Sequence, residues 1–98
     1  MGVLSHLEPK AVFDFFERLC AVPHGSGNTR IISDLCVTMA RELGLRYRQE
    51  DCNNVIIWKD ASPGYESAAP VILQGHMDMV CAQTEDCPKD MTLSLINI

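Results

Sequence analysis

An aliphatic run, Val71–Leu73, leads directly into a polar turn that contains Gly75, His76 and Asp78. A short run of this kind, rich in β-branched residues and followed by turn residues, predicts a buried β-strand. In open α/β sheets, binding and catalytic side chains gather outside the carboxyl ends of the strands. The sequence therefore predicts an α/β fold whose functional residues follow this strand.

His76 and Asp78 are separated by one residue, so in near-extended backbone their side chains point to the same side. This arrangement suits a metal-binding imidazole whose second nitrogen is held by a carboxylate. The alternative is a polar turn in which Asp78 caps a following segment, because a His-x-Asp tripeptide alone is a weak signal. A catalytic zinc ion needs three protein ligands and a water, and the sequence offers one convincing ligand, His76.

Two amphipathic helices are predicted before this strand. The first begins near Pro9, because proline is tolerated in the first helical turn, and ends before Pro23. The second ends at Gly44, the residue type preferred just after a helix. Its apolar stripe at helical spacing consists of Ile32, Leu35, Cys36, Met39, Ala40 and Leu43.

The loop between the helices, residues 24–28, contains two glycines. Its spacing is not that of a phosphate-binding or dinucleotide-binding loop. We interpret it as a turn that caps the second helix through Ser26 or Asn28.

A β-hairpin is predicted between the second helix and the central strand, with strands at Leu45–Gln49 and Val55–Trp58. Residues 51–54 supply turn chemistry between them, and the β-prone stretch Met91–Ile98 closes the chain. Two helices and three or four strands cannot cover both faces of an α/β sheet. We therefore expect the N-terminal portion of an α/β/α domain, incomplete as it stands.

The composition excludes several function classes. The chain has 98 residues, enough for one small domain, and a net charge of −5. Its basic residues are scattered, so nucleic acid and anionic membranes are poor partners. The sequence shows no signal peptide and no apolar run long enough to span a bilayer. We expect a cytoplasmic protein.

Five cysteines form an odd set without a tight disulfide framework, which favours a reducing compartment. Cys20 and Cys36 fall on the apolar helix faces and are predicted to lie in the core. Cys81 and Cys87 are spaced more widely than the ligands of ordinary zinc knuckles. A thiol-based metal or redox module is therefore the weakest of the functional hypotheses.

Other polar residues add little to the candidate site. His6 lies near the chain terminus, and His24 is predicted to be a solvated or turn residue. No serine or cysteine has a base and an orienting group at suitable spacing, so nucleophilic catalysis has no support. The acidic residues after the central strand are interpreted as a solvated loop: Glu85, Asp86 and Asp90.

Three segments together resemble the Xaa-His dipeptidases: Pro23–Asn28, Asn53–Ile56 and Val71–Val80. These enzymes are also called aminoacyl-histidine or cytosol non-specific dipeptidases, and they belong to the di-zinc metallopeptidases. The resemblance covers about residues 4–91. It implies a zinc-peptidase-like α/β/α catalytic domain, of which this sequence holds the N-terminal part.

In that family the histidine of the His-x-Asp motif binds one metal ion, and the aspartate steadies its imidazole. The resemblance thus implies that His76 is a metal ligand and Asp78 a catalytic residue, with no other cofactor-binding residue. A complete family member holds two zinc ions, with cobalt or manganese as possible substitutes. It hydrolyses short peptides, including Xaa-His peptides, with metal-activated water. Family members are often homodimers that associate through a second domain.

The family's bridging aspartate, its glutamate base and its remaining ligands lie further along its chain than this sequence extends. We therefore divide the sequence into residues 1–91, the N-terminal part of a catalytic domain, and residues 92–98, a non-family tail. Such a truncated or frame-shifted product is expected to be inactive alone and to lack the dimerising domain. The alternative is a non-catalytic α/β interaction or oligomerising fragment, which would pair its open strand edge with another chain.

Overall fold

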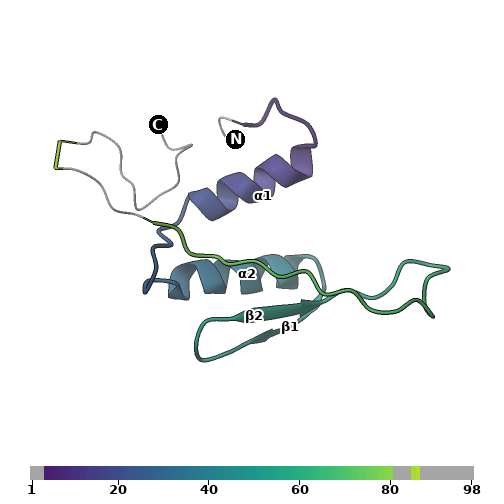
Figure 1. Cartoon of the computed structure of the whole chain (residues 1–98). Coiled ribbons are helices and arrows are strands. Elements are labelled where there is room, and N and C mark those ends of the chain that lie inside the picture. The colour runs from purple at the N-terminus through teal and green to yellow at the C-terminus, as the bar shows by residue number, and fades with distance from the viewer. Residues whose placement is uncertain (1–3, 81–84, 87–98) are drawn as a thin grey trace. The chain divides into compact units, whose positions relative to one another are not determined.

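The structure, a computed structural model, describes residues 4–80, 85 and 86. Its elements follow the order α1 (Lys10–Cys20), α2 (Arg30–Glu42), β1 (Arg46–Gln49) and β2 (Val55–Trp58), as Figure 1 shows. The chain divides into two compact units, residues 33–76 and the remainder. The predicted α/β class, with two helices before the strands, is confirmed.

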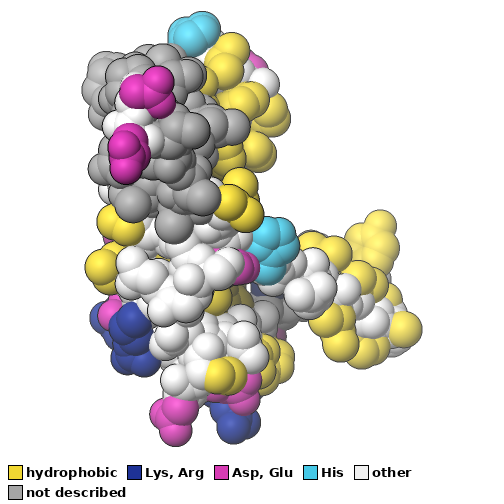
Figure 2. Space-filling view, turned by 60° about the vertical axis from the view of Figure 1, so that its left-hand side comes forward, with side chains coloured by type: hydrophobic (Ala, Val, Ile, Leu, Met, Phe, Trp, Pro, Cys, Tyr) yellow, Lys and Arg dark blue, Asp and Glu magenta, His cyan; other side chains and the backbone are white. Residues whose placement is uncertain are grey.

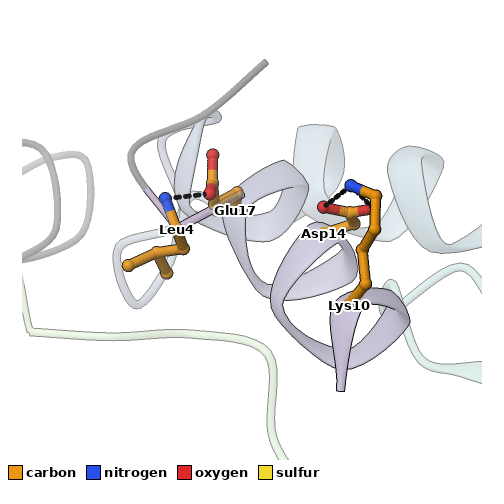
Figure 3. Close-up of polar contacts among 4 residues, drawn as sticks. All are labelled: Leu4, Lys10, Asp14 and Glu17. Atoms are coloured by element: carbon orange, nitrogen blue, oxygen red, sulfur yellow. Dashed lines mark hydrogen bonds and ion pairs between the residues drawn. The ribbon is translucent and has the colours of Figure 1, made fainter. Parts of the chain in front are cut away.

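Helix α1 begins directly after Pro9, whose backbone is extended at φ −71° and ψ 131°. Its first turns carry an exposed ion pair between Lys10 and Asp14, with 3.1 Å between Nζ and Oδ2 (Figure 3). Further along the helix, the Glu17 carboxylate accepts a hydrogen bond of 2.6 Å from the Leu4 backbone N–H. This second bond fixes the entering chain against the helix, because it joins residues that are 13 positions apart in the sequence.

Helix α2 ends in the paired hydrogen bonds of a Schellman motif. The Leu45 N–H donates to the Ala40 carbonyl at 2.9 Å, and the Gly44 N–H donates to the Arg41 carbonyl at 3.1 Å. Gly44 has a φ of +70°, a left-handed conformation that costs other residues free energy. The end of helix α2 that Gly44 predicted is therefore confirmed.

Among the residues that the structure describes, few side chains are buried, and most of these belong to α2. Ile32, Met39 and Ala40 from the predicted stripe are buried, whereas Leu43 at the end of the helix is 59% exposed. The buried apolar residues are Cys20, Ile32, Val37, Met39 and Ala40.

A polar contact joins the sheet to α2 within the unit of residues 33–76. The Gln49 Nε2 atom donates to the Ser33 Oγ and the Asp34 Oδ1 atoms, each at 2.9 Å. Ser33 is fully buried, so its hydroxyl needs such a partner. The amide of Gln49 therefore fixes the end of β1 against the helix.

Strands β1 and β2 form the predicted hairpin. They pair antiparallel, with Arg46 opposite Trp58 and Gln49 opposite Val55. The turn is closed by the Asn53 N–H, which donates to the Glu50 carbonyl at 2.9 Å. Asn53 has a φ of 74°, a conformation that asparagine tolerates better than most residues.

The predicted buried strand over Val71–Leu73 is wrong in this structure. Val71, Ile72 and Leu73 are 82%, 90% and 93% exposed and lie in a segment without regular structure. A strand is stable only where a neighbour pairs its backbone N–H and C=O groups, and the described residues form only the two strands of the hairpin. Figure 2 shows many apolar side chains at the surface of the face drawn. The β-prone stretch Met91–Ile98 lies outside the described residues.

We predict that Gly44→Ala lowers the free energy of unfolding by about 1 to 2 kcal/mol, the cost of a left-handed residue with a Cβ. Open space surrounds the position that the Cβ would take, so the cost comes from the backbone alone. Urea unfolding followed by the helical circular dichroism signal measures the effect. Gly75→Ala is the matched control, because Gly75 also faces open space but lacks a positive φ. Equal stability of the two variants would contradict the prediction.

Candidate functional site

The two residues predicted to carry the chemistry lie at the end of the exposed segment. His76 is exposed and Asp78 is half-buried. The next residue, Met79, donates its backbone N–H to the His24 carbonyl at 2.8 Å. Gly25 and Met79 thereby form an isolated parallel β-bridge. The backbone beside Asp78 is thus attached to the loop between the two helices.

This loop contains the turn that the glycines predicted. The Asn28 N–H donates to the Gly25 carbonyl at 2.9 Å, and Gly27 has a φ of +81°. A positive φ at the third residue of a four-residue turn is the requirement of a type II turn. Ser26 therefore occupies the second position of the turn, and its side chain is exposed.

The predicted capping of α2 by Ser26 or Asn28 is wrong. The helix begins at Arg30, so Thr29 is the residue that precedes it. The Ser26 hydroxyl instead donates to the Asp78 Oδ2 atom at 2.5 Å. A carboxylate is a stronger acceptor than a neutral group, which explains why the hydroxyl faces Asp78.

His24 was expected to be a solvated or turn residue; it lies in the loop, which agrees with one half of this expectation, but it is not solvated. The side chain is only 5% exposed. Its Nδ1 atom lies 2.6 Å from the Val22 carbonyl oxygen, and since a carbonyl only accepts, Nδ1 must carry the proton. The imidazole can be buried because this local bond satisfies its donor. His24 is therefore a structural residue of the loop and an unsuitable partner for a metal at His76.

Two of the described side chains are of kinds that bind metal ions. The imidazole of His76 and the carboxylate of Asp78 are donors of the kinds that zinc binds. However, no group of three or more histidine, cysteine or acidic residues gathers around a common point in the part of the chain that the structure describes. The chemistry of the two side chains fits a zinc ion, but two donors are fewer than the three protein ligands that a catalytic zinc ion needs.

The cysteines that the structure describes do not extend this site. Cys20 is buried in the core and Cys52 is exposed, and neither forms a disulfide. Burial raises the pKa of the Cys36 thiol, so at neutral pH the thiolate needed for metal binding is disfavoured. The predicted core position is confirmed for Cys20, whereas Cys36 is only half-buried. Cys81 and Cys87 lie outside the described residues.

Two further observations bear on function. Glu85 and Asp86 form an exposed turn, which agrees with the predicted solvated acidic loop; Asp90 lies outside the described residues. Within the described ranges, no helix combines the length and apolar character that crossing a bilayer requires.

Sequence reasoning missed the contact between Ser26 and Asp78. These residues are 52 positions apart, and a turn serine gives no local signal of such a partner. The glycines on either side of Ser26 were the available clue, because they indicate a backbone bent for a close approach.

Comparison with known proteins gives a consistent picture. No protein-family model matches the sequence. Over 92 residues, or 94% of this chain, the sequence is 35% identical to the cytosol non-specific dipeptidase of Escherichia coli K12. The fold matches the crystal structure of aminoacylhistidine dipeptidase from Vibrio alginolyticus with a TM-score of 0.80 and 38% identity, covering 91% of this chain.

The match covers nearly all of this chain but a small part of each relative. The chain spans 19% of the length of the Escherichia coli protein and 18% of the Vibrio alginolyticus chain. Both sequence and fold agree with the resemblance carried by the Gly-Ser-Gly loop and the His-x-Asp segment. Over its matched residues, this chain is therefore similar in both sequence and fold to the N-terminal part of the Xaa-His dipeptidases.

Proposed function

We propose that this chain is the N-terminal part of a metal-dependent dipeptidase that hydrolyses short peptides of the Xaa-His type. The observation that carries the proposal is the match to two dipeptidases over more than nine-tenths of the chain. The matched fold includes a tethered Asp78, two residues after an exposed His76. Zinc is the proposed metal, with cobalt or manganese as alternatives.

The proposed roles follow from the chemistry of the two side chains. His76 is exposed, so its imidazole is accessible to an ion and serves as one metal ligand. Asp78 holds the ring nitrogen of His76 that does not face the metal ion. It thereby fixes the tautomer of the imidazole and the direction of its metal-binding nitrogen. A bound metal ion of this kind polarises a peptide carbonyl and lowers the pKa of its water.

The chain alone is proposed to be inactive. Hydrolysis needs two further protein ligands for a zinc ion and a general base within hydrogen-bond reach of the attacking water. No group of three or more metal-binding side chains gathers among the described residues, so the proposed site holds one ligand, His76, and one orienting carboxylate, Asp78. The missing groups therefore have to come from the remainder of a dipeptidase domain.

The other features of the proposal rest on the same resemblance. Residues 1–91 are proposed to be the N-terminal part of the catalytic domain, and residues 92–98 are proposed to be a tail outside the family pattern. The Escherichia coli relative is a cytosol non-specific dipeptidase, which supports a cytoplasmic location. Short peptides are the proposed substrates, and the dimerisation of relatives is proposed to use a domain other than this one.

A graft tests this proposal directly. Residues 4–91 replace the matching N-terminal stretch of the Escherichia coli cytosol non-specific dipeptidase, and hydrolysis of an Xaa-His dipeptide is measured with added zinc. We expect the graft to hydrolyse the peptide and His76→Ala within it to lower kcat/KM by at least about 100-fold, because a lost ligand impairs metal binding. The 98-residue chain alone should give no hydrolysis.

Glu85→Ala is the control for the graft, because Glu85 is an exposed acidic residue in the same region. This variant should retain the activity of the unmodified graft. A folded graft that holds metal and hydrolyses peptide equally well with and without His76 would contradict the proposed role. Hydrolysis by the isolated 98-residue chain, lost in His76→Ala, would contradict its proposed inactivity.

A second candidate function is a non-catalytic fragment that pairs with another chain. The exposed apolar run Val71–Leu73 favours it, because unpaired, extended and apolar backbone is a template for strand addition. Strand β2 adds exposed apolar side chains in the same compact unit: Ile56, Ile57 and Trp58. This surface would be buried by a second copy of the chain.

If the second function holds, the purified chain should elute from size-exclusion chromatography as a dimer or larger species. Ile72→Lys should then shift it towards the monomer, because a buried charge without a partner opposes association. Val12→Lys is the matched control, since Val12 is 60% exposed but lies on α1. A wild-type monomer across the concentrations tested would count against the second function.

A further inference from the structure

The loop between the helices holds the segment that follows His76 at two points. The backbone contact is the bond of 2.8 Å from the Met79 N–H to the His24 carbonyl. The side-chain contact is the bond of 2.5 Å from the Ser26 hydroxyl to the Asp78 carboxylate. The two contacts involve adjacent residues on one segment, so they fix both the path of the backbone and the direction of one side chain.

The geometry of the turn explains why the second contact is formed by residue 26. The backbone bond fixes the loop beside Met79, and Gly25 is buried there. Ser26 is the next residue, and the left-handed Gly27 then turns the chain away. A residue other than glycine at position 27 would be strained at this φ, so the turn restricts where the hydroxyl can lie.

The hydroxyl contacts Asp78 through one defined atom, Oδ2. A hydroxyl bonded to an ionised carboxylate forms one of the stronger hydrogen bonds in proteins, and its usual O–O distance begins near 2.5 Å. The bond therefore selects one orientation of the carboxylate. An oriented carboxylate is what a metal-binding histidine requires of the group that holds its second nitrogen.

We propose that Ser26 is a positioning residue of the candidate metal site, which acts by fixing the Asp78 carboxylate in the orientation that serves His76. This inference rests on the proposed function, since it assigns Ser26 to the same His-x-Asp site. Ser26 itself binds no metal and takes no part in proton transfer. Its effect reaches the ion only through Asp78.

The test uses the 98-residue chain in solution, with Mn²⁺ alone as the probe. Manganese(II) favours oxygen ligands over thiolates, so the cysteines compete weakly. Its unpaired electrons broaden the NMR signals of nearby residues, so binding at the His76 ring is observed separately from binding elsewhere. The measured quantity is the Mn²⁺ concentration at which the His76 ring signals lose half of their intensity.

We expect Ser26→Ala to raise this concentration about ten-fold, the lower end of the effect of removing a group that supports a metal ligand. Ser26→Thr keeps the hydroxyl and should bind close to the wild type. In an Asp78→Ala background, Ser26→Ala should cause no further loss, because residues that act through one another are not additive. Ser62→Ala, at an exposed serine in the loop after β2, should have no effect.

A check on folding accompanies the titration. The amide signals of α2 should be unchanged in Ser26→Ala, which shows that the turn variant still folds. Wild-type affinity in Ser26→Ala, equal losses in the alanine and threonine variants, or additive losses with Asp78→Ala would overturn the inference.

The titration also separates this inference from the proposed function. If the His76 ring signals do not respond to Mn²⁺, the inference about Ser26 is overturned, because it requires this chain to place an ion at His76. The graft described above then decides the ligand role of His76 separately. If they respond, and His76→Ala abolishes the broadening of the neighbouring Met77 amide, the ligand role stands. The Ser26 variants then decide the inference alone.

Discussion

The candidate site depends on the hydrogen bond from the Met79 N–H to the His24 carbonyl. This bond brings two distant parts of the chain into register, and the Ser26–Asp78 bond forms beside it. A single neutral hydrogen bond stabilises a folded protein by about 1 kcal/mol, and one to a charged group by about 1.5 to 3 kcal/mol. The two bonds therefore stabilise this attachment only modestly. The burial of His24 and Gly25 beside them also helps to hold the two segments in register.

In contrast to the attached segment at Asp78 and Met79, the run Val71–Leu73 is exposed. Its side chains are those of a buried strand, yet they are more than four-fifths exposed. Burying a valine, isoleucine or leucine side chain contributes about 1.5 to 3 kcal/mol, so a partner that covered this run would stabilise it strongly. Both proposed functions require such a partner, either the remainder of a dipeptidase domain or a second copy of the chain.

The accuracy of the sequence predictions follows from the range of the interactions. The end of α2 and the hairpin were predicted correctly, because Gly44 and the turn at Asn53 act on the residues beside them. The strand at Val71 was predicted wrongly, because a buried strand requires neighbouring strands and a local sequence pattern does not reveal whether they are present. For the same reason sequence reasoning predicted His76 and Asp78 as a pair but missed Ser26, whose partner is 52 residues away.

The attachment of Asp78 to a turn separates the two tasks of the proposed site. The Asp78 carboxylate accepts its bond from Ser26 within this chain, whereas in the proposed site other ligands complete the coordination of an ion at His76. A group that is oriented before the ion arrives loses little conformational freedom on binding, which favours tight and specific coordination. Such a division suits an N-terminal part of a catalytic domain, because its contribution is already in place when the groups that complete the site are added.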